Sequence, residues 1–123
     1  AQLLADAQQA GFLCRQEAAS MLPVLALKIE AQHLVLDLCA APGSKTMQIL
    51  DHGFGVAGKS PTYVPPGLIM ANDVKPSRLT RLVDRVRRVA STPLVTTCYD
   101  ARAHPGACFT AQSMKSVGSG FDR

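Results

Sequence analysis

The chain has 123 residues, 47% of them hydrophobic, and a formal net charge of +4. This length suits one domain with one core, and the apolar share is that of a globular protein rather than a disordered one. No apolar run approaches the roughly 20 residues of a membrane-spanning helix, and residues 1–10 lack the basic-then-apolar order of a signal peptide. The positive charge is compatible with a polyanionic partner or with ordinary solubility.

The cysteine pattern predicts no metal site. The four cysteines stand at positions 14, 39, 98 and 108, without a C-x-x-C pair or a Cys/His cluster of zinc spacing. Reduced thiols in an intracellular setting are the default where no export signal is visible. We therefore expect Cys14, Cys98 and Cys108 to be ordinary thiols.

Two short helices are expected before the first strand. Residues 1–10 are rich in helix formers, and Gly11 is a natural stop. Residues 15–21 predict a second helix, with a break or kink at Pro23 because proline lacks a backbone N–H. The apolar residues 24–27 are interpreted either as a short strand or as a packed extension.

A strand, a tight turn and a helix are predicted between residues 34 and 50. Leu34–Leu38 is a continuous apolar run, as expected of a parallel strand buried on both faces. The exception, Asp37, either accepts hydrogen bonds from the following turn or orients a ligand. Pro42-Gly43 breaks the run, and residues 45–50 predict a helix. The turn has neither the P-loop spacing nor the glycines of a dinucleotide fingerprint, so a compact ligand suits it better than a pyrophosphate.

Lys45 is an unusual charge for its place. It stands in the predicted first turn of a helix, where the helix dipole disfavours a cation by about 0.3–1 kcal/mol. A residue that breaks a local rule is a functional candidate. The alternative is a lysine whose amino group reaches solvent.

The second and third predicted strands are each followed by an acid. Residues 53–66 contain three glycines and three prolines and predict a loop, as do the polar residues 110–120. Residues 67–73 predict a strand that ends at Asp73, and residues 94–99 predict one that Asp100 follows. A carboxylate after the second strand is placed either to bind ribose hydroxyls or to cap the next helix.

A helix is predicted from Pro76 to about Ala90, because proline suits a first helical position. Its apolar face repeats at three- and four-residue spacing and comprises Leu79, Leu82, Val83, Val86 and Ala90. A basic stripe of Arg78, Arg81, Arg85 and Arg88 either is a solvated face or follows RNA phosphates. We expect Arg78 to face inward and support the loop near Asp73.

The run Asp37-Leu38-Cys39-Ala40-Ala41-Pro42-Gly43-Ser44-Lys45-Thr46 resembles the cofactor motif of the Nop/Sun RNA (cytosine-5) methyltransferases. Residues 15–23 and the run Ala71-Asn72-Asp73-Val74 through Arg78 resemble the eukaryotic tRNA-modifying branch of that family. The resemblance covers most of residues 12–101. It implies an α/β, Rossmann-like core that binds S-adenosylmethionine and a transfer of its methyl group to C5 of cytosine in RNA, tRNA above all.

The resemblance also implies which residues hold the cofactor and where the protein works. Lys45 would assist near the reacting base, and a nuclear or nucleolar location is expected. The residues implied in cofactor binding are Cys39, Ala40, Ala41, Pro42, Gly43, Ser44, Lys45, Asp73 and Asp100.

The two catalytic cysteine motifs of the family are not found in this sequence. We therefore expect a partial catalytic domain that is inactive alone, with leading helices over 1–30, a cofactor-binding half over 31–101, and a loop over 102–123 that leads to a missing fourth strand. Attack on C6 of cytosine needs a thiolate, and Cys39 lies inside the cofactor loop. One alternative is an inactive cofactor-binding module or truncated paralogue, and another is a methyltransferase for protein or small molecules.

The predicted strand order 3-2-1 leaves the first strand at an edge of the sheet. An exposed apolar edge promotes association. We therefore expect this chain to self-associate through that edge.

Overall fold

The computed structural model describes residues 2–9, 13–55, 63–87, 93–104 and 121–122. The predicted loop at 110–120, the end of the predicted helix at 88–90, and Cys108 lie outside these residues. No helix within the described ranges is long and apolar enough to span a membrane. The elements in chain order are α1 (Gln2–Gln9), α2 (Ala18–Ala26), β1 (Leu34–Asp37), α3 (Ser44–Gln48), the π-helix η1 (Ile49–Gly53), β2 (Leu68–Asn72), α4 (Pro76–Val86), β3 (Leu94–Thr97) and the 3-10 helix η2 (Ala101–Ala103).

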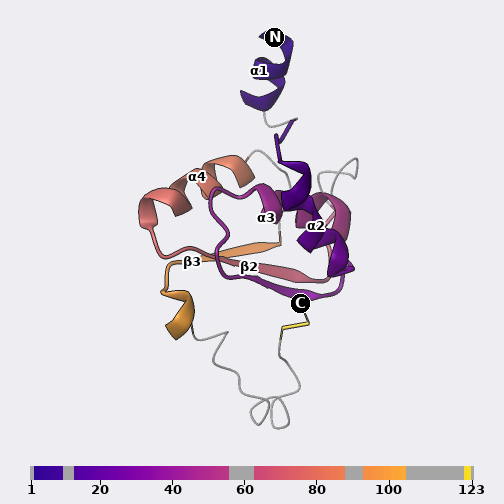
Figure 1. The fold of residues 1–123 in the computed structure, drawn as a ribbon. Helices are drawn as coiled ribbons and strands as arrows, with labels where there is room; N and C mark the ends of the chain where they lie inside the picture. The colour runs from indigo at the N-terminus through magenta and orange to yellow at the C-terminus, as the bar shows by residue number, and fades with distance from the viewer. Residues whose placement is uncertain (1, 10–12, 56–62, 88–92, 105–120, 123) are drawn as a thin grey trace.

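The described strands form one parallel sheet in the order β1-β2-β3. The α/β class and the strand order predicted from the sequence are therefore confirmed. Helices α2, α3 and α4 lie on the same side of this sheet (Figure 1). This is the expected result when successive right-handed crossovers step in one direction across a sheet.

The core lies between the sheet and these helices. Val35, Ile69 and Ala71 point from the sheet into it and are almost fully buried. From the helical side, Leu50 and Leu82 are fully buried, and Leu79 and Val83 pack against the cluster. The predicted apolar face of α4 is thus confirmed for its described residues.

The other face of the sheet is also apolar, but it is only half-buried. The register sets Leu36 beside Met70, and Met70 beside Val95, in one row. Leu34 and Leu68 form a neighbouring pair on the same face. Among these side chains, Val95 is 43% exposed. Both faces of β1 and β2 therefore carry hydrophobic residues.

Helix α2 corrects two expectations. It continues through Pro23 to Ala26, so the predicted break is absent and the strand interpretation of residues 24–27 is wrong. The bond that Pro23 lacks would have reached the carbonyl of Ala19, and both residues are exposed, so water can replace it. Val24, the next residue along the helix, is buried in the core, which stabilises the helical conformation.

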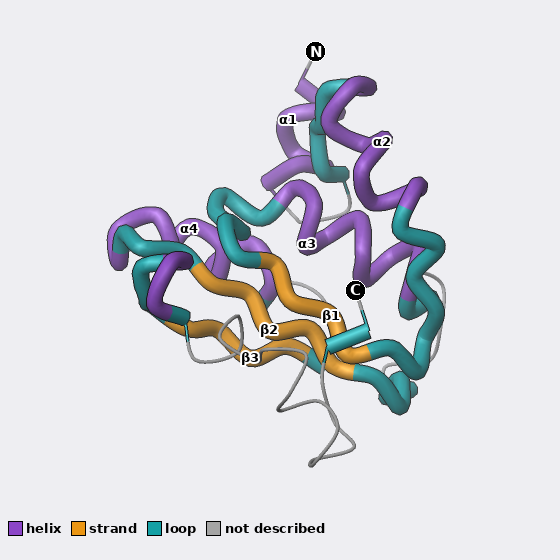
Figure 2. Tube along the Cα trace, turned by 60° about the horizontal axis from the view of Figure 1, so that its bottom comes forward, coloured by secondary structure: helices purple, strands orange, loops and turns teal. Residues whose placement is uncertain are grey.

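The edge of β1 is partly covered by residues far along the chain. The Asp122 N–H donates to the Leu34 carbonyl at 2.8 Å, and the Leu34 N–H donates to the Asp122 carboxylate at 2.8 Å. Figure 2 shows this C-terminal segment beside β1. Because backbone groups alternate in direction along a parallel strand, the N–H and C=O of Leu36 point to the same side as those of Leu34.

Gly67 allows the chain to enter β2 against the segment that precedes β1. Its N–H donates to the Ala31 carbonyl at 2.8 Å, and a Cβ on Gly67 would lie 2.6 Å from that oxygen and in collision with the His33 carbonyl. Both obstacles are backbone atoms that are held in place by the sheet. A side chain at this position would therefore push the two strands apart.

We expect Gly67→Ala to lower the free energy of unfolding by about 2 kcal/mol, as overpacking of a tight site does. Urea unfolding followed by circular dichroism measures the loss. Gly53→Ala is the control, because its two nearest contacts, at 2.7 and 3.1 Å, are side-chain atoms of Ile29 and not backbone oxygens. Equal losses for the two variants would show that the backbone contact at Gly67 has no special importance.

A candidate binding site at the carboxyl ends of the strands

A hollow of about 180 Å³ lies where the three parallel strands end. Residues after β1, β2 and β3 all contribute to it, because the carboxyl ends of parallel strands meet at one edge of the sheet. This is the edge at which open α/β sheets bind ligands. The lining residues are Leu38, Cys39, Asp73, Val74, Arg78, Asp100 and Ala101.

The turn between β1 and α3 is built around Gly43. This residue has φ 99°, a conformation that favours glycine. A Cβ on Gly43 would lie 3.3 Å from Cγ of Leu82, so the glycine also lets the turn approach α4 closely. The Gly43 N–H donates to the Ala40 carbonyl at 2.7 Å, and the Met47 N–H donates to the Gly43 carbonyl at 2.9 Å. The turn is therefore compact, as predicted.

Asp37 accepts hydrogen bonds from the turn that follows it. The Thr46 hydroxyl donates to its carboxylate at 2.9 Å and the Cys39 N–H at 3.3 Å. Burial raises the pKa of Asp37 above its ordinary value; these two hydrogen bonds and the charge of Lys45 oppose the increase, and the charge of Asp73 adds to it. The turn-bonded interpretation of Asp37 is thus confirmed.

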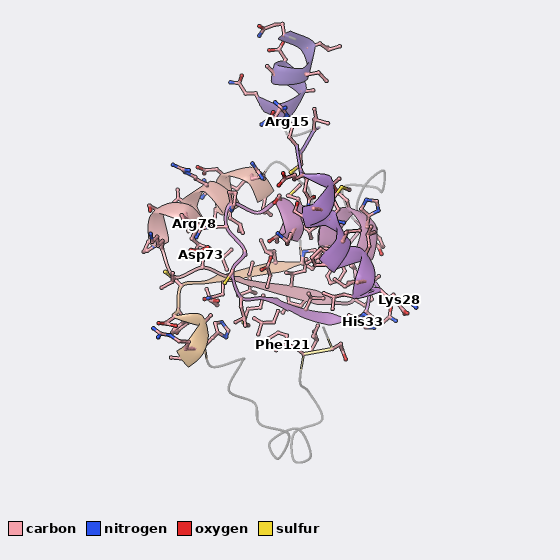
Figure 3. The ribbon with its side chains drawn as sticks, in the orientation of Figure 1. Arg15, Lys28, His33, Asp73, Arg78 and Phe121 are labelled. Atoms are coloured by element: carbon pink, nitrogen blue, oxygen red, sulfur yellow. The ribbon has the colours of Figure 1, made fainter. Side chains whose placement is uncertain are left out.

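Asp73 is 2% exposed and binds the start of α4. It accepts a hydrogen bond from the Lys75 N–H at 3.0 Å, and its other oxygen lies 3.4 Å from the Arg78 guanidinium. The N-cap position of α4 itself is occupied by Lys75, so Asp73 is not the N-cap residue. Figure 3 shows Asp73 and Arg78 next to each other at this edge of the fold.

Arg78 connects helix α4 to the turn after β1. Its guanidinium donates to the Ala41 carbonyl at 2.6 Å while it pairs with Asp73. The expectation that Arg78 faces inward and supports the loop near Asp73 is confirmed. One side chain therefore joins two of the segments that line the hollow.

Asp100 is paired with a neighbour in η2. Arg102 donates to both of its oxygens, at 3.0 and 2.6 Å, and the Arg102 backbone N–H donates at 2.9 Å. These bonds, first those of the guanidinium and then that of the backbone, lower the pKa of Asp100 to about 2. The side chain of Asp100 is therefore a carboxylate at neutral pH, and a ligand would share it with Arg102.

The hollow contains three of the residues that the family resemblance implies in cofactor binding, namely Cys39, Asp73 and Asp100. Lys45 is exposed on α3 and does not line the hollow, although its charge acts on Asp37. The residues of the turn that fall outside the lining are Ala40, Ala41, Pro42, Gly43 and Ser44. Within the described residues, no group of His, Cys, Asp or Glu is placed to hold a metal ion.

Sequence reasoning assigned no binding role to Leu38, Val74 and Ala101, which also belong to the lining. All three are apolar residues that directly follow an acid, and nothing in their local pattern marks them as binding residues. It also gave no role to Asn72, which is fully buried at the end of β2. The signal for Asn72 was available, since a polar residue that ends an apolar strand needs hydrogen-bond partners.

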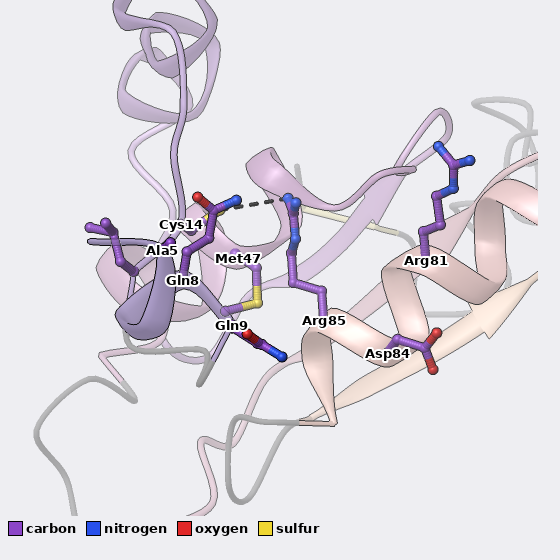
Figure 4. A pocket seen from close by; sticks show the side chains of 9 residues that line it. Ala5, Gln8, Gln9, Cys14, Met47, Arg81, Asp84 and Arg85 are labelled. Carbon is purple, nitrogen blue, oxygen red and sulfur yellow. Dashed lines mark hydrogen bonds between the residues drawn. The ribbon is translucent and has the colours of Figure 1, made fainter. Parts of the chain in front are cut away.

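A larger pocket of about 480 Å³ lies between α1 and α4 (Figure 4). Arg81 and Arg85 of the predicted basic stripe line it, and Arg85 donates to the Cys14 sulfur at 3.7 Å. It contains none of the residues of the turn after β1. The basic stripe is therefore divided, with Arg78 at the strand ends and the next two arginines at this second pocket.

The fold is that of a class of protein, the Rossmann-like methyltransferases that use S-adenosylmethionine. NSun6 from Pyrococcus horikoshii, solved with SFG, superposes with a TM-score of 0.65 at 25% identity, over 78% of this chain and 22% of that one. Residues 24–123 match the family described as 16S rRNA methyltransferase RsmB/F. The chain belongs to this family.

Two curated relatives are similar over most of this chain. The tRNA (cytosine(34)-C(5))-methyltransferase of Drosophila melanogaster is 37% identical over 93% of it, and the multisite-specific tRNA:(cytosine-C(5))-methyltransferase of Saccharomyces cerevisiae is 40% identical over 77% of it. The chain spans only 15% and 13% of the lengths of these proteins.

The raised pKa of Asp37 predicts a dependence of stability on pH. Because the folded state binds this proton more tightly than the unfolded state, the stability that the group contributes is present below its ordinary pKa of 3.8 and is lost as the pH rises through the folded-state value. We expect Asp37→Asn to gain stability relative to the wild type as the pH rises above 3.8, because the buried carboxyl of the wild type must then ionise. Urea unfolding at each pH measures this difference.

Asp84→Asn is the control for this experiment, since Asp84 is an exposed acid on α4. An equal gain in this variant would show a general effect of removing one negative charge, not an effect of burial at Asp37. If Asp37→Asn shows no gain toward neutral pH, burial does not dominate the proton affinity of Asp37.

Proposed function

We propose that this chain carries the cofactor-binding part of an enzyme that transfers a methyl group from S-adenosylmethionine to C5 of cytosine in RNA, with tRNA as the favoured substrate. One observation carries the proposal: Cys39, Asp73 and Asp100 follow three different strands and line one hollow. Membership of the family and the activities named for the two relatives support the reaction and the substrate.

The residues around the hollow fit a nucleoside. Carboxylates accept hydrogen bonds from hydroxyl and amino groups and repel phosphates. We assign Asp73 to the ribose hydroxyls and Asp100 to the adenine side. We assign the remaining amino-acid part of the cofactor to the compact turn around Gly43, which follows Cys39 of the lining. The solved NSun6 protein supports the choice of cofactor, since its bound SFG is an analogue of S-adenosylmethionine.

Within this proposal, the chain's own residues bind and orient while the cofactor supplies an electrophilic methyl group. The Arg78 guanidinium holds Asp73 and the Ala41 carbonyl together, so the acid and the turn keep a constant spacing. Lys45 is exposed on the helix that begins at the turn and is proposed to assist near the base. RNA is the proposed partner, and a nuclear or nucleolar location stays a prediction.

We expect S-adenosylhomocysteine to bind this chain in a calorimetric titration, and Asp73→Asn to weaken the binding by about tenfold or more. Hydrogen bonds to a charged acceptor are strong enough for that loss. The asparagine keeps an oxygen that can accept from the Lys75 N–H, which limits damage to the start of α4.

Asp84→Asn makes the same charge change on α4, outside the hollow, and should bind as the wild type does. A wild-type chain that is folded by circular dichroism but does not bind S-adenosylhomocysteine would falsify the proposed cofactor site. Equal weakening by both variants would point to a general effect of charge instead.

We also propose that the chain self-associates through the edge of β1. The proposal rests on the apolar character of that strand and on the direction of the Leu36 backbone groups, which point away from β2. Sedimentation velocity should show a weight-average mass that rises with concentration, and Leu36→Pro should reduce the rise, because proline removes an edge N–H. A single monomeric species at every concentration would contradict this proposal.

A further inference from the structure

Asn72 forms four hydrogen bonds inside the protein at the end of β2. Its side-chain nitrogen donates to the Leu38 carbonyl at 3.1 Å and to the Tyr99 carbonyl at 2.9 Å. Its oxygen accepts from the Thr97 hydroxyl at 3.1 Å and from the Tyr99 N–H at 2.9 Å. The side chain is fully buried. An asparagine can donate two bonds and accept two, so its full capacity is used.

The partners decide which way the amide faces. Carbonyl oxygens only accept and a backbone N–H only donates. The nitrogen must therefore face Leu38 and Tyr99 oxygens, and the oxygen must face the Tyr99 nitrogen. No flipped orientation of Asn72 satisfies these three backbone groups.

The backbone groups that Asn72 bonds lie at the lining of the hollow or next to it. Leu38 itself lines the hollow and precedes Cys39, Asn72 precedes Asp73, and Tyr99 precedes Asp100. The main chain of Asn72 adds to the same arrangement, because its carbonyl accepts from the Ala40 N–H at 2.8 Å. One residue therefore holds the backbone of all three segments at the point where they leave the sheet.

We infer that Asn72 is a positioning residue that sets the spacing of Cys39, Asp73 and Asp100, and through them the affinity for the nucleoside part of the cofactor. The inference rests on the proposed function. The Asn72 amide belongs to β2 and bonds to the segments that follow β1 and β3. Neither Asp73 nor Asp100 can do the same, since each of these acids follows one strand only.

Other residues cannot replace the amide. An aspartate keeps the acceptor for Tyr99 and Thr97 but loses both donors, and it sets a negative charge against two carbonyl oxygens. A leucine of similar size leaves the same backbone groups buried and unpaired, which costs more than the hydrogen bonds themselves contribute. Asn72→Asp is thus the smallest change that removes the connection between the strands.

Thr97 offers a milder second variant. Its hydroxyl has one proton, which goes to the Asn72 oxygen, so it accepts from the Nε2–H of His104 at 3.0 Å. His104 packs its ring edge-on against Tyr99 at a centroid distance of 5.6 Å. Thr97→Val removes one of the four Asn72 bonds and keeps the shape of the side chain.

The test is calorimetric titration of S-adenosylhomocysteine, with thermal unfolding measured in parallel. We expect Asn72→Asp to weaken binding by about tenfold and Thr97→Val by a smaller factor. Gln48→Leu is the matched control, because Gln48 is a buried amide bonded to Gln16 and to the Met21 carbonyl, away from the hollow. It should lower the unfolding temperature and leave the affinity unchanged.

A coupling measurement separates positioning from a general loss of stability. In the Asp100→Asn background, Asn72→Asp should weaken binding by a smaller factor than in the wild type, since one of the groups it positions is already impaired. Equal factors in both backgrounds would overturn the positioning role. If Asn72→Asp does not fold, the same comparison is made with Thr97→Val.

The failures of the two proposals are distinguishable. A folded wild type that does not bind S-adenosylhomocysteine overturns both the proposed function and this inference. A wild type that binds, together with an Asn72→Asp chain that is folded and binds equally well, overturns the inference alone. Loss of affinity in Gln48→Leu to the same degree would also contradict it.

Discussion

The parallel pairing of β1, β2 and β3 is the constraint on which the rest of the structure depends. It brings the carboxyl ends of three strands to one edge, although the residues that follow them lie far apart in the sequence. The ladder aligns the strands but not the segments beyond them. Those segments are held by polar side chains instead, with Arg78 joining α4 to the turn after β1 and Asn72 joining all three strand ends.

The buried polar groups that hold the site in place also lower the stability of the fold. Asp37 is held in a setting that raises its pKa, so its charged form is disfavoured by burial even with two hydrogen bonds. Asp73 lies close enough to add to this effect. A carboxylate in such a position is tolerated when it organises a neighbouring turn, and the turn after β1 depends on Asp37 for bonds to Thr46 and Cys39. Stability and site geometry are therefore set by the same buried groups.

Most of the elements could be predicted from local patterns. The apolar run of β1, the spacing of Leu82 and Val86 in α4, and the acid after β2 each carry their own signal. The continuation of α2 through Pro23 could not be predicted locally, because it depends on the burial of Val24 against a core made by distant residues. The same holds for the candidate site. The acids were visible as strand ends, whereas the partners of Asn72 come from segments up to 34 residues away.

The two apolar faces of the sheet bear on how the strands find their alignment. In a sheet with one polar face, a slip of one residue buries polar side chains and is rejected. In β1 and β2 such a slip would exchange one set of hydrophobic residues for another, such as Val35 for Leu36. Hydrophobic patterning therefore discriminates weakly between registers here. The register is instead selected by contacts at the two ends of the strand pair. At one end Gly67 fits closely against the Ala31 and His33 carbonyls, and at the other Asn72 donates to the Leu38 carbonyl.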